Sequence, residues 1–417
     1  MPYLTSRLLA PDSRVFADPK VGPDETTFQV DNTSDAYYSS PYYKAHQADL
    51  LPIPTGPPAV PLDLAAVVPP NFLAPYMAAK TMTFHCVGDT GISMAVRMAN
   101  EAGVADAMVA DLARQGAASP AFLFHLGDVI YNFGEAEYYY DQFYEPFRGY
   151  DRPIFAIPGN HDAEVQYGAD VKTPLAPTLM AFLRNFCAAA PGRSPDSGAV
   201  LRTTMTQPGV YFTLDAPFVS IVGLYTNVLE GPGVISSQGG QFSPPLDDAQ
   251  LNWLKAELNR LKGPRANRER AIVLACHHPP VSADAVHGGS VGQAADIDSA
   301  CEEAGLWPDA IVSGHAHLYQ RFTRTIAGGR QIPYIVAGSG GHNVSLPRGE
   351  VVGKAPITWG EYTLVKEPLL EYGYLTVTVD MSHAGSERMA IRFQSPVDPS
   401  AGDEVMVNLA SHALSGA

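Results

Sequence analysis

Five short segments of the 417-residue chain carry side chains that can bind metal ions through oxygen or through an imidazole nitrogen. Residues 88–91, 127–131 and 158–162 supply carboxylates, a phenol and an amide, whereas residues 276–280 and 313–317 supply histidines. The donors that we single out are Asp89, Asp128, Tyr131, Asn160, His277, His315 and His317. Each segment alone is ordinary turn or capping chemistry. Five of them in one chain predict a metal site.

The donor types indicate which metals suit the site and how many ions it holds. Carboxylate, phenol, amide and imidazole groups without thiolate favour iron, manganese or zinc over copper or a sulfur-bound centre. His315 and His317 are two residues apart, and alternate side chains of an extended segment point the same way. Seven protein ligands are too many for one catalytic ion with an open position, and they suit two ions that share a bridging ligand.

The donor segments follow short apolar runs, which predict buried strands. These runs are residues 83–87, 122–126, 154–157, 219–224, 272–276 and 310–312. Helical patterns lie between several of them, at residues 93–115, 178–189 and 247–261, and Gly263-Pro264 is expected to end the last helix. Later strand-like runs, at residues 333–336, 374–379 and 389–393, have no helices between them. This order predicts an α/β domain with mixed sheets, in which ligands bind where strands end.

The five segments together resemble the calcineurin-like metallophosphoesterases, and within them the purple acid phosphatases. That group is marked, in this order, by Gly-Asp-x-Gly, Gly-Asp-x-x-Tyr, Gly-Asn-His-Asp/Glu, Val-x-x-His and Gly-His-x-His. Only the fourth block departs, because Leu274 replaces its valine, and residues 337–342 also look like this family. The resemblance covers residues 81–395. It implies a four-layer sandwich of two mixed β-sheets flanked by helices.

The resemblance assigns the donors to two ions. Asp128 would bridge them, and the two remaining ligand sets would be Asp89, Tyr131 and His317 for one ion and Asn160, His277 and His315 for the other. Tyr131 is the discriminating residue, because a phenolate stabilises trivalent iron and gives these enzymes their purple colour. The implied cofactors are Fe(III) with Fe(II), Zn(II) or Mn(II). The alternative reading of Tyr131 is a core tyrosine near a mononuclear or dizinc site.

The resemblance implies an acid phosphatase that hydrolyses phosphate monoesters with a metal-activated hydroxide. One alternative is a phosphodiesterase that acts on small nucleotide or phospholipid headgroup diesters with the same centre, because substrate choice lies in the loops. A more remote alternative is a binding scaffold without catalysis. The intact ligand set argues against the scaffold. Residues 162–174 and 342–368 are long loops that we expect to form walls or a lid of the site.

Further histidines qualify for roles around the metals. His161 follows Asn160 directly and is the candidate to protonate the leaving oxygen, with Asp162 to orient its ring; the alternative is a structural histidine at a tight turn. His278 is expected to face away from His277, behind the metal ligands, and it is also a candidate for substrate contacts. His287 lies where plant members of the family carry substrate-contacting histidines. The remaining candidates are His342 and Arg321 for substrate contacts, and His85 and His125 for the core.

The overall charge limits the partners. Lysine and arginine number 27 against 43 acidic residues, and the net charge is −16. Nothing would offset repulsion from polyanions, so nucleic acid and anionic membranes are not expected as partners, whereas a small phosphate ester is. Four cysteines without paired spacing predict free thiols. No signal peptide or membrane span is evident, which predicts a cytoplasmic protein, or a periplasmic or secreted one if a signal has been removed.

Residues 1–80 differ from the rest of the chain. They hold 13 of the 36 prolines and six of the 20 tyrosines. Proline at this density excludes long helices and central strands, while the aromatic residues argue against a fully solvated tail. We therefore predict an extended arm over residues 1–80 that packs on a catalytic domain at residues 81–417, near its active-site face.

Overall fold

The computed structural model describes residues 27–30, 49, 60–92, 98–131, 133–165, 167, 173–226, 233–237 and 247–416. Most of the predicted arm, the start of the helix expected at residues 93–115 and part of the loop expected at residues 162–174 lie outside these ranges. Within the described part, no helix combines the length and the apolar character that crossing a membrane requires. All four cysteines are free thiols, as expected.

Seven of the described strands form one sheet. They are β3 (Thr81–Val87), β4 (Leu123–His125), β5 (Ile154–Ala156), β15 (Tyr374–Asp380), β16 (Arg388–Gln394), β17 (Gly402–Asn408) and β18 (Leu414–Ser415). Their order is β18-β17-β16-β15-β3-β4-β5. β3, β4 and β5 are parallel neighbours, and β15 joins β3 antiparallel with Val377 opposite Phe84. The parallel strands are buried almost throughout, which is why they read as continuous apolar runs.

Nine further strands in the described ranges form the second sheet. They are β2 (Leu62–Asp63), β6 (Phe212–Ala216), β7 (Val219–Gly223), β8 (Ala271–Cys276), β10 (Ala310–Ser313), β11 (Tyr319–Thr325), β12 (Gln331–Ala337), β13 (Ile357–Trp359) and β14 (Tyr362–Leu364). Their order is β13-β14-β11-β12-β10-β8-β7-β6-β2. β7, β8, β10 and β12 are parallel neighbours. β1 (Gln29–Val30) and β9 (Gly289–Ser290) form a separate parallel pair.

The two sheets pack face to face. One buried cluster joins Phe84 and Phe124 of the seven-stranded sheet to Ile221 and Val312 of the nine-stranded sheet. Burying such side chains stabilises the fold by about 1.5–3 kcal/mol each. The sandwich therefore has its main core between the sheets.

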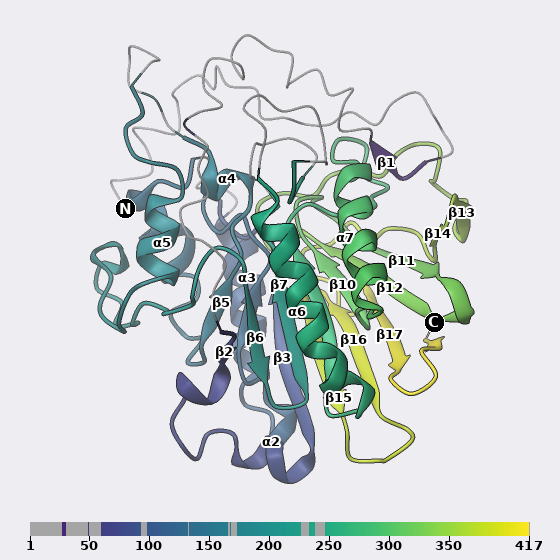
Figure 1. Ribbon diagram of the computed structural model, residues 1–417. Helices are drawn as coiled ribbons and strands as arrows, with labels where there is room; N and C mark the ends of the chain where they lie inside the picture. The colour runs from purple at the N-terminus through teal and green to yellow at the C-terminus, as the bar shows by residue number, and fades with distance from the viewer. Residues whose placement is uncertain are drawn as a thin grey trace.

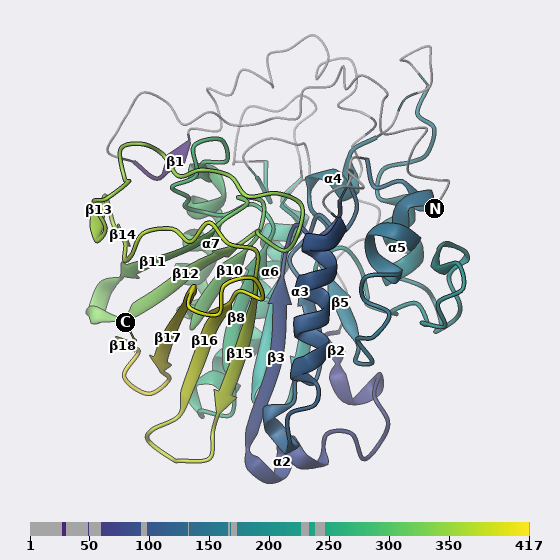
Figure 2. The same cartoon turned by 180° about the vertical axis from the view of Figure 1, so that it is seen from behind.

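Helices cover the outer faces of both sheets. The α-helices in the described ranges are α2 (Ala74–Ala79), α3 (Met98–Asp111), α4 (Asn160–Ala163), α5 (Met180–Phe186), α6 (Ala249–Ala266) and α7 (Val291–Ala304). α6 and α7 lie on the nine-stranded sheet (Figure 1), and α3 lies on β3 and β4 of the other sheet (Figure 2). These four layers confirm the predicted α/β sandwich of two mixed sheets flanked by helices.

Two local predictions are wrong. The helix expected to stop at Gly263-Pro264 continues to Ala266, because the Arg265 guanidinium donates to the buried Asp309 carboxylate at 2.7 and 2.8 Å and holds the last turn. The stretch 342–368 is not entirely loop. It contains the hairpin of β13 and β14, which extends the nine-stranded sheet next to β11.

Segments before residue 81 contact the sandwich at several points. β2 pairs with β6 at the edge of the nine-stranded sheet, and the Tyr76 side chain is buried between the sheets. Phe28, just before β1, is buried in the cluster that α6 and α7 form with the nine-stranded sheet. The Tyr167 hydroxyl donates a hydrogen bond to Asp49. The division at residue 80 stays a prediction.

Candidate metal centre

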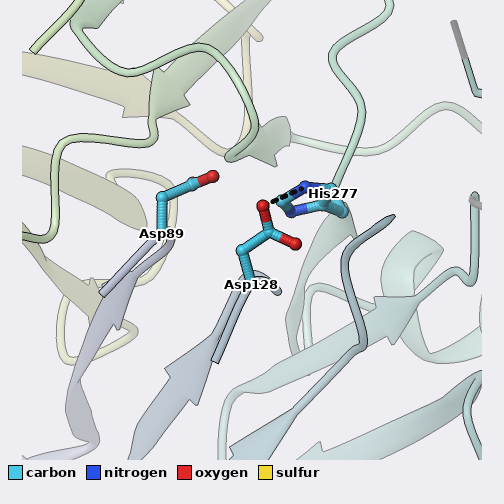
Figure 3. A group of neighbouring side chains, drawn as sticks. All are labelled: Asp89, Asp128 and His277. Carbon is cyan, nitrogen blue, oxygen red and sulfur yellow. Dashed lines mark ion pairs between the residues drawn. The ribbon is translucent and has the colours of Figure 1, made fainter. Parts of the chain in front are cut away.

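Strand ends of both sheets bring the predicted ligands to one edge of the sandwich. Asp89 and Asp128 follow β3 and β4, and Asn160 follows β5 as the first residue of α4. His277 follows β8, and His315 follows the neighbouring β10. Because each set of strands is parallel, their carboxyl ends lie at the same edge. Asp89, Asp128 and His277 point toward one another there (Figure 3), with ligand atoms all within 4.8 Å of one another.

One half of the centre gathers around the Tyr131 hydroxyl. This hydroxyl lies 2.8 Å from Oδ2 of Asp128, 3.3 Å from Oδ1 of Asp89 and 3.3 Å from Nε2 of His317. Nε2 of His317 is also 3.5 Å from Oδ1 of Asp89. A phenol, two carboxylates and an imidazole therefore converge at one point, as predicted for the first ligand set and the bridging aspartate.

The other half gathers around the side-chain oxygen of Asn160. This oxygen lies 3.0 Å from Nε2 of His277 and 3.1 Å from Nδ1 of His315. Nε2 of His277 is in turn 3.4 Å from Oδ2 of Asp128. The same Asp128 oxygen thus reaches a member of each ligand set. The structure brings all seven predicted ligands together in two adjoining groups.

Three of the predicted ligand residues have backbone conformations that are unusual for residues other than glycine. The φ angles of Asp89, Asp128 and His315 are 59°, 54° and 67°, in the left-handed region. Such conformations persist only where their surroundings hold them, and they concentrate at functional sites. Gly127 has a φ of 100°, and a Cβ there would lie 2.5 Å from Nδ1 of His277. The crowding explains why glycine precedes Asp128.

Hydrogen bonds behind the histidines set which ring nitrogen faces the centre. Nδ1 of His277 lies 2.9 Å from the carbonyl oxygen of Leu126 and donates to it, which leaves Nε2 as the ring nitrogen that faces Asp128 and Asn160. Nδ1 of His317 lies 2.6 Å from the side-chain oxygen of Asn343 and presents Nε2 in the same way. This pattern is typical of metal-binding histidines. Asn343 follows His342 directly but was missed, because no motif marks it.

The charges at the centre favour a bound cation. Burial, Asp128 and Asp89 raise the pKa of Tyr131 well above its usual value, so its phenol is protonated in the metal-free protein. Burial alone would raise the pKa of Asp128, but His277 and His161 outweigh it and hold that pKa below its usual range. Burial likewise lowers the pKa of His277, but the Asp128 carboxylate outweighs it and raises the pKa to about 9. Two buried carboxylates beside a phenol and three imidazoles form a donor set that suits metal ions and lacks a permanent cation.

Two polar side chains hold the ligand loops from behind. Asp162 accepts hydrogen bonds from the backbone N–H groups of Val129, Ile130 and Gly159 at 3.1, 3.0 and 2.9 Å. It therefore ties the Asp128 loop to the start of α4 and supports the centre. Gln142 brackets Tyr131, because its side chain accepts from the Tyr131 N–H at 2.8 Å and donates to the Tyr131 carbonyl at 2.7 Å. Gln142 was missed, since it lies in a short aromatic-rich π-helix, Tyr140–Tyr144, with no sequence signal.

Three further imidazoles surround the ligands. The His342 ring stacks on Tyr131 with centroids 3.6 Å apart, and the His161 ring lies 4.2 Å from Tyr131. The His161 backbone N–H also donates to Oδ1 of Asp128 at 2.9 Å. The His287 ring is 4.4 Å from that of His315. His161, His287 and His342 therefore lie beside the ligands, where the sequence had placed them as candidates.

The other candidates are distributed as follows. His278 lies behind the ligands, as expected, with Nδ1 2.9 Å from the Thr226 hydroxyl and its ring 4.2 Å from that of His315. His85 and His125 are buried in the core, as expected. Arg321 is a correction, because its guanidinium is buried and donates to the Asp403 carboxylate at 2.6 Å. That ion pair occupies the side chain and withdraws it from any substrate contact.

The chain is similar to a known family and to several solved structures. A family model described as calcineurin-like phosphoesterase matches residues 82–319. Among solved structures, the purple acid phosphatase PPD1 from yellow lupin (Lupinus luteus) seeds has a TM-score of 0.51 and 13% identity, over 76% of this chain and 52% of that chain. GAP50, the anchor in the inner membrane complex of Plasmodium, has a TM-score of 0.49 and 13% identity, over 76% of this chain and 86% of that chain. A dimetal phosphatase from Danio rerio has a TM-score of 0.45 and 12% identity, over 79% of this chain and 99% of that chain.

At these identities the structural similarities concern the fold alone, and the chain spans about half the length of the lupin protein. A comparison with curated proteins finds no significant match. The family model, in contrast, covers more than half of the chain and includes all seven predicted metal ligands. The chain belongs to the calcineurin-like phosphoesterase family.

Proposed function

We propose that the chain is a purple acid phosphatase-like enzyme that hydrolyses phosphate monoesters at a centre of two metal ions. The observation that carries the proposal is the position of the Asp128 carboxylate. Its Oδ2 lies 2.8 Å from the Tyr131 hydroxyl and 3.4 Å from Nε2 of His277. One carboxylate is thus within reach of both ligand sets, as a bridging ligand must be.

The residues that would hold the two ions are Asp89, Tyr131 and His317 on one side, Asn160, His277 and His315 on the other, and Asp128 between them. Ions bound there would supply Lewis-acid activation of a water molecule and neutralise charge on phosphoryl oxygens. We propose Fe(III) with Fe(II), Zn(II) or Mn(II). The phenol of Tyr131 supports iron, because a tyrosine at this position marks the purple acid phosphatase pattern.

His161 is the proposed source of the proton for the leaving oxygen. Its backbone N–H donates to Asp128, which fixes the residue beside the centre, and its ring packs against Tyr131. Proton transfer from a positioned histidine contributes about 10²–10⁴-fold to a rate. Asp162 acts indirectly, because its three backbone hydrogen bonds hold the Asp128 loop and the His161 turn together.

The imidazoles beside the metal ligands favour a monoester over a diester. His161 comes from α4, whereas His287 and His342 come from two loops. Nδ1 of His342 donates to the carbonyl oxygen of Gly91 at 2.9 Å, which leaves the His161 and His287 rings to donate an N–H to a phosphoryl oxygen. A monoester dianion has three terminal oxygens, whereas a diester has two and carries less charge. Two such donors around a cationic centre therefore suit the monoester. The overall charge of −16 remains unfavourable to long polyanions.

The proposal is tested with purified full-length chain of known metal content. Nitrophenyl phosphate and bis(nitrophenyl) phosphate are assayed from acidic to alkaline pH. We expect faster turnover of the monoester, loss of activity in Asp128→Asn, and unchanged activity in the surface control Asp151→Asn, whose side chain is 69% exposed. Faster turnover of the diester would favour the phosphodiesterase alternative. No turnover of either ester by the metal-loaded chain would contradict both.

A further inference from the structure

One backbone carbonyl before β1 holds both ends of the loop that carries His287. The N–H groups of Ser282 and Gly289 donate to the carbonyl oxygen of Phe28 at 3.0 and 3.1 Å. The loop thus leaves and returns to a single point that lies more than 250 residues away along the chain. β1 and β9 continue this contact as a parallel pair, with Gln29 opposite Gly289.

Phe28 is itself firmly anchored. Its side chain is 1% exposed, and its ring lies 4.9 Å from the Phe322 ring and 4.4 Å from the Trp359 ring. The Arg348 guanidinium donates to the carbonyl of Thr27, and the Gln29 side chain donates to the carbonyl of Pro280 at 3.0 Å. The segment 27–30 is therefore bound to the domain on both sides of Phe28.

Asp284 links the inside of this loop to the segment that carries His315 and His317. Its Oδ1 accepts the backbone N–H of His287 at 2.8 Å, and its other oxygen accepts the Ser345 hydroxyl. The Ser345 N–H donates to the carbonyl of His317 at 3.0 Å. The His287 ring lies 4.4 Å from the His315 ring as a result. Contacts thus run without a break from Phe28 through the loop to the metal-binding histidines.

We infer that residues 27–30 are a tether that positions His287 over the metal centre, with Phe28 as its positioning residue. The hydrogen bonds from Ser282 and Gly289 close the base of the loop, and the Phe28 ring supplies the anchor in the core. The effect of the tether on turnover rests on the proposed function. Its effect on the loop does not.

Hydrogen exchange tests the tether without any substrate. In the full-length chain, Phe28→Ala should speed exchange of the amides in peptides covering residues 282–289 by about tenfold or more, because it removes the anchor. Phe28→Leu refills the site and should restore most of the protection. Phe186→Ala is the matched control, since Phe186 is equally buried but packs against Phe182 on α5. Unchanged exchange in Phe28→Ala would overturn the inference.

A second variant serves if Phe28→Ala does not fold. Arg348→Met removes the guanidinium bond to Thr27 and keeps the apolar stem. We expect the same amides to exchange about two- to fivefold faster in this variant. Unchanged exchange there, in a folded protein, would contradict the tether as well.

Kinetics test whether the tether acts through His287. For nitrophenyl phosphate we expect Phe28→Ala to raise KM several-fold with a smaller change in kcat, as His287→Ala does. The double variant should be no worse than His287→Ala, because both changes remove the same interaction. Additive effects would overturn positioning through His287. If the metal-loaded wild type hydrolyses no phosphate ester, the proposed function fails, and the exchange measurements alone decide on the tether.

Discussion

The Tyr131 hydroxyl donates a hydrogen bond to Oδ2 of Asp128 at 2.8 Å, at the point where the predicted ligands of two metal ions meet. The two residues are three positions apart, so a single turn after β4 brings both to the centre. Gln142 holds the Tyr131 backbone on both its N–H and its carbonyl. The phenol is therefore positioned before any metal binds.

Replacing this phenol should remove the colour of the iron-loaded protein. We expect Tyr131→Phe to abolish the visible absorption band, because the band requires a phenolate bound to trivalent iron. The matched control is Tyr139→Phe, since Tyr139 is fully buried but its hydroxyl has no hydrogen-bond partner among the described residues. Absorption spectra of the purified proteins check this. A band that persists in Tyr131→Phe would remove tyrosine from the ligand set.

Metal content and stability should change together. We expect close to two metal ions per chain by elemental analysis, and a lower Tm after chelation, because the buried Asp89 and Asp128 carboxylates then lose the metal charge that offsets their own. Binding at a hundredfold excess over Kd stabilises a folded protein by about 2.7 kcal/mol per site. Asp128→Asn should bind less metal and show a smaller shift of Tm. A protein that holds no metal even after reconstitution would contradict the dinuclear centre.

The role of His161 is separable from metal binding. We expect His161→Ala to lower kcat about 10²–10⁴-fold, the usual contribution of a general acid, while the metal content stays unchanged. His383→Ala is the control, because His383 is exposed on the loop after β15. Steady-state kinetics on nitrophenyl phosphate and elemental analysis measure the two properties independently. Turnover unchanged by His161→Ala would exclude the proposed proton transfer.

A buried ion pair far from the metals should control acid stability. Asp309 is 1% exposed and binds the Arg265 guanidinium at two points, so Asp309→Asn should cost about 3–5 kcal/mol in free energy of unfolding. The exposed pair of Glu145 and Arg148 is the control, because Glu145→Gln should cost at most about 1 kcal/mol. Urea denaturation at neutral pH measures both variants. An equal loss of unfolding free energy in Asp309→Asn and Glu145→Gln would show that burial does not strengthen the ion pair.

The ion pair of Asp309 and Arg265 should also make the folded protein less stable as the pH falls. Burial alone would raise the pKa of Asp309, but His412 and Arg265 outweigh it and hold the pKa below the usual value of 3.8. A depressed pKa in the folded state stabilises the protein above the unfolded value, and this contribution is lost as the pH falls through the folded pKa. Below pH 3.8 the gap between the wild type and Asp309→Asn should therefore narrow. A gap that stays constant on acidification would contradict this assignment.

The sequence by itself indicated the candidate ligands and the layers of the fold. Asp89, Asp128 and Asn160 could be read directly, because each lies within a short motif at the end of a strand, where local order along the chain also sets position in space. Buried parallel strands such as β3 and β8 read as apolar runs for the same reason. Such features depend on neighbours in sequence.

Only the tertiary structure decided the features that join distant segments. The Asn343 side chain selects the nitrogen that His317 presents, Arg265 extends α6 past Pro264 by binding Asp309, and Arg321 is drawn to Asp403. No motif encodes these contacts, because each forms between groups that are far apart in the chain or come from unrelated elements. The Phe28 carbonyl under the His287 loop is of the same kind. Side-chain partners and loop positions follow from packing, whereas the predicted ligands could be named from local sequence.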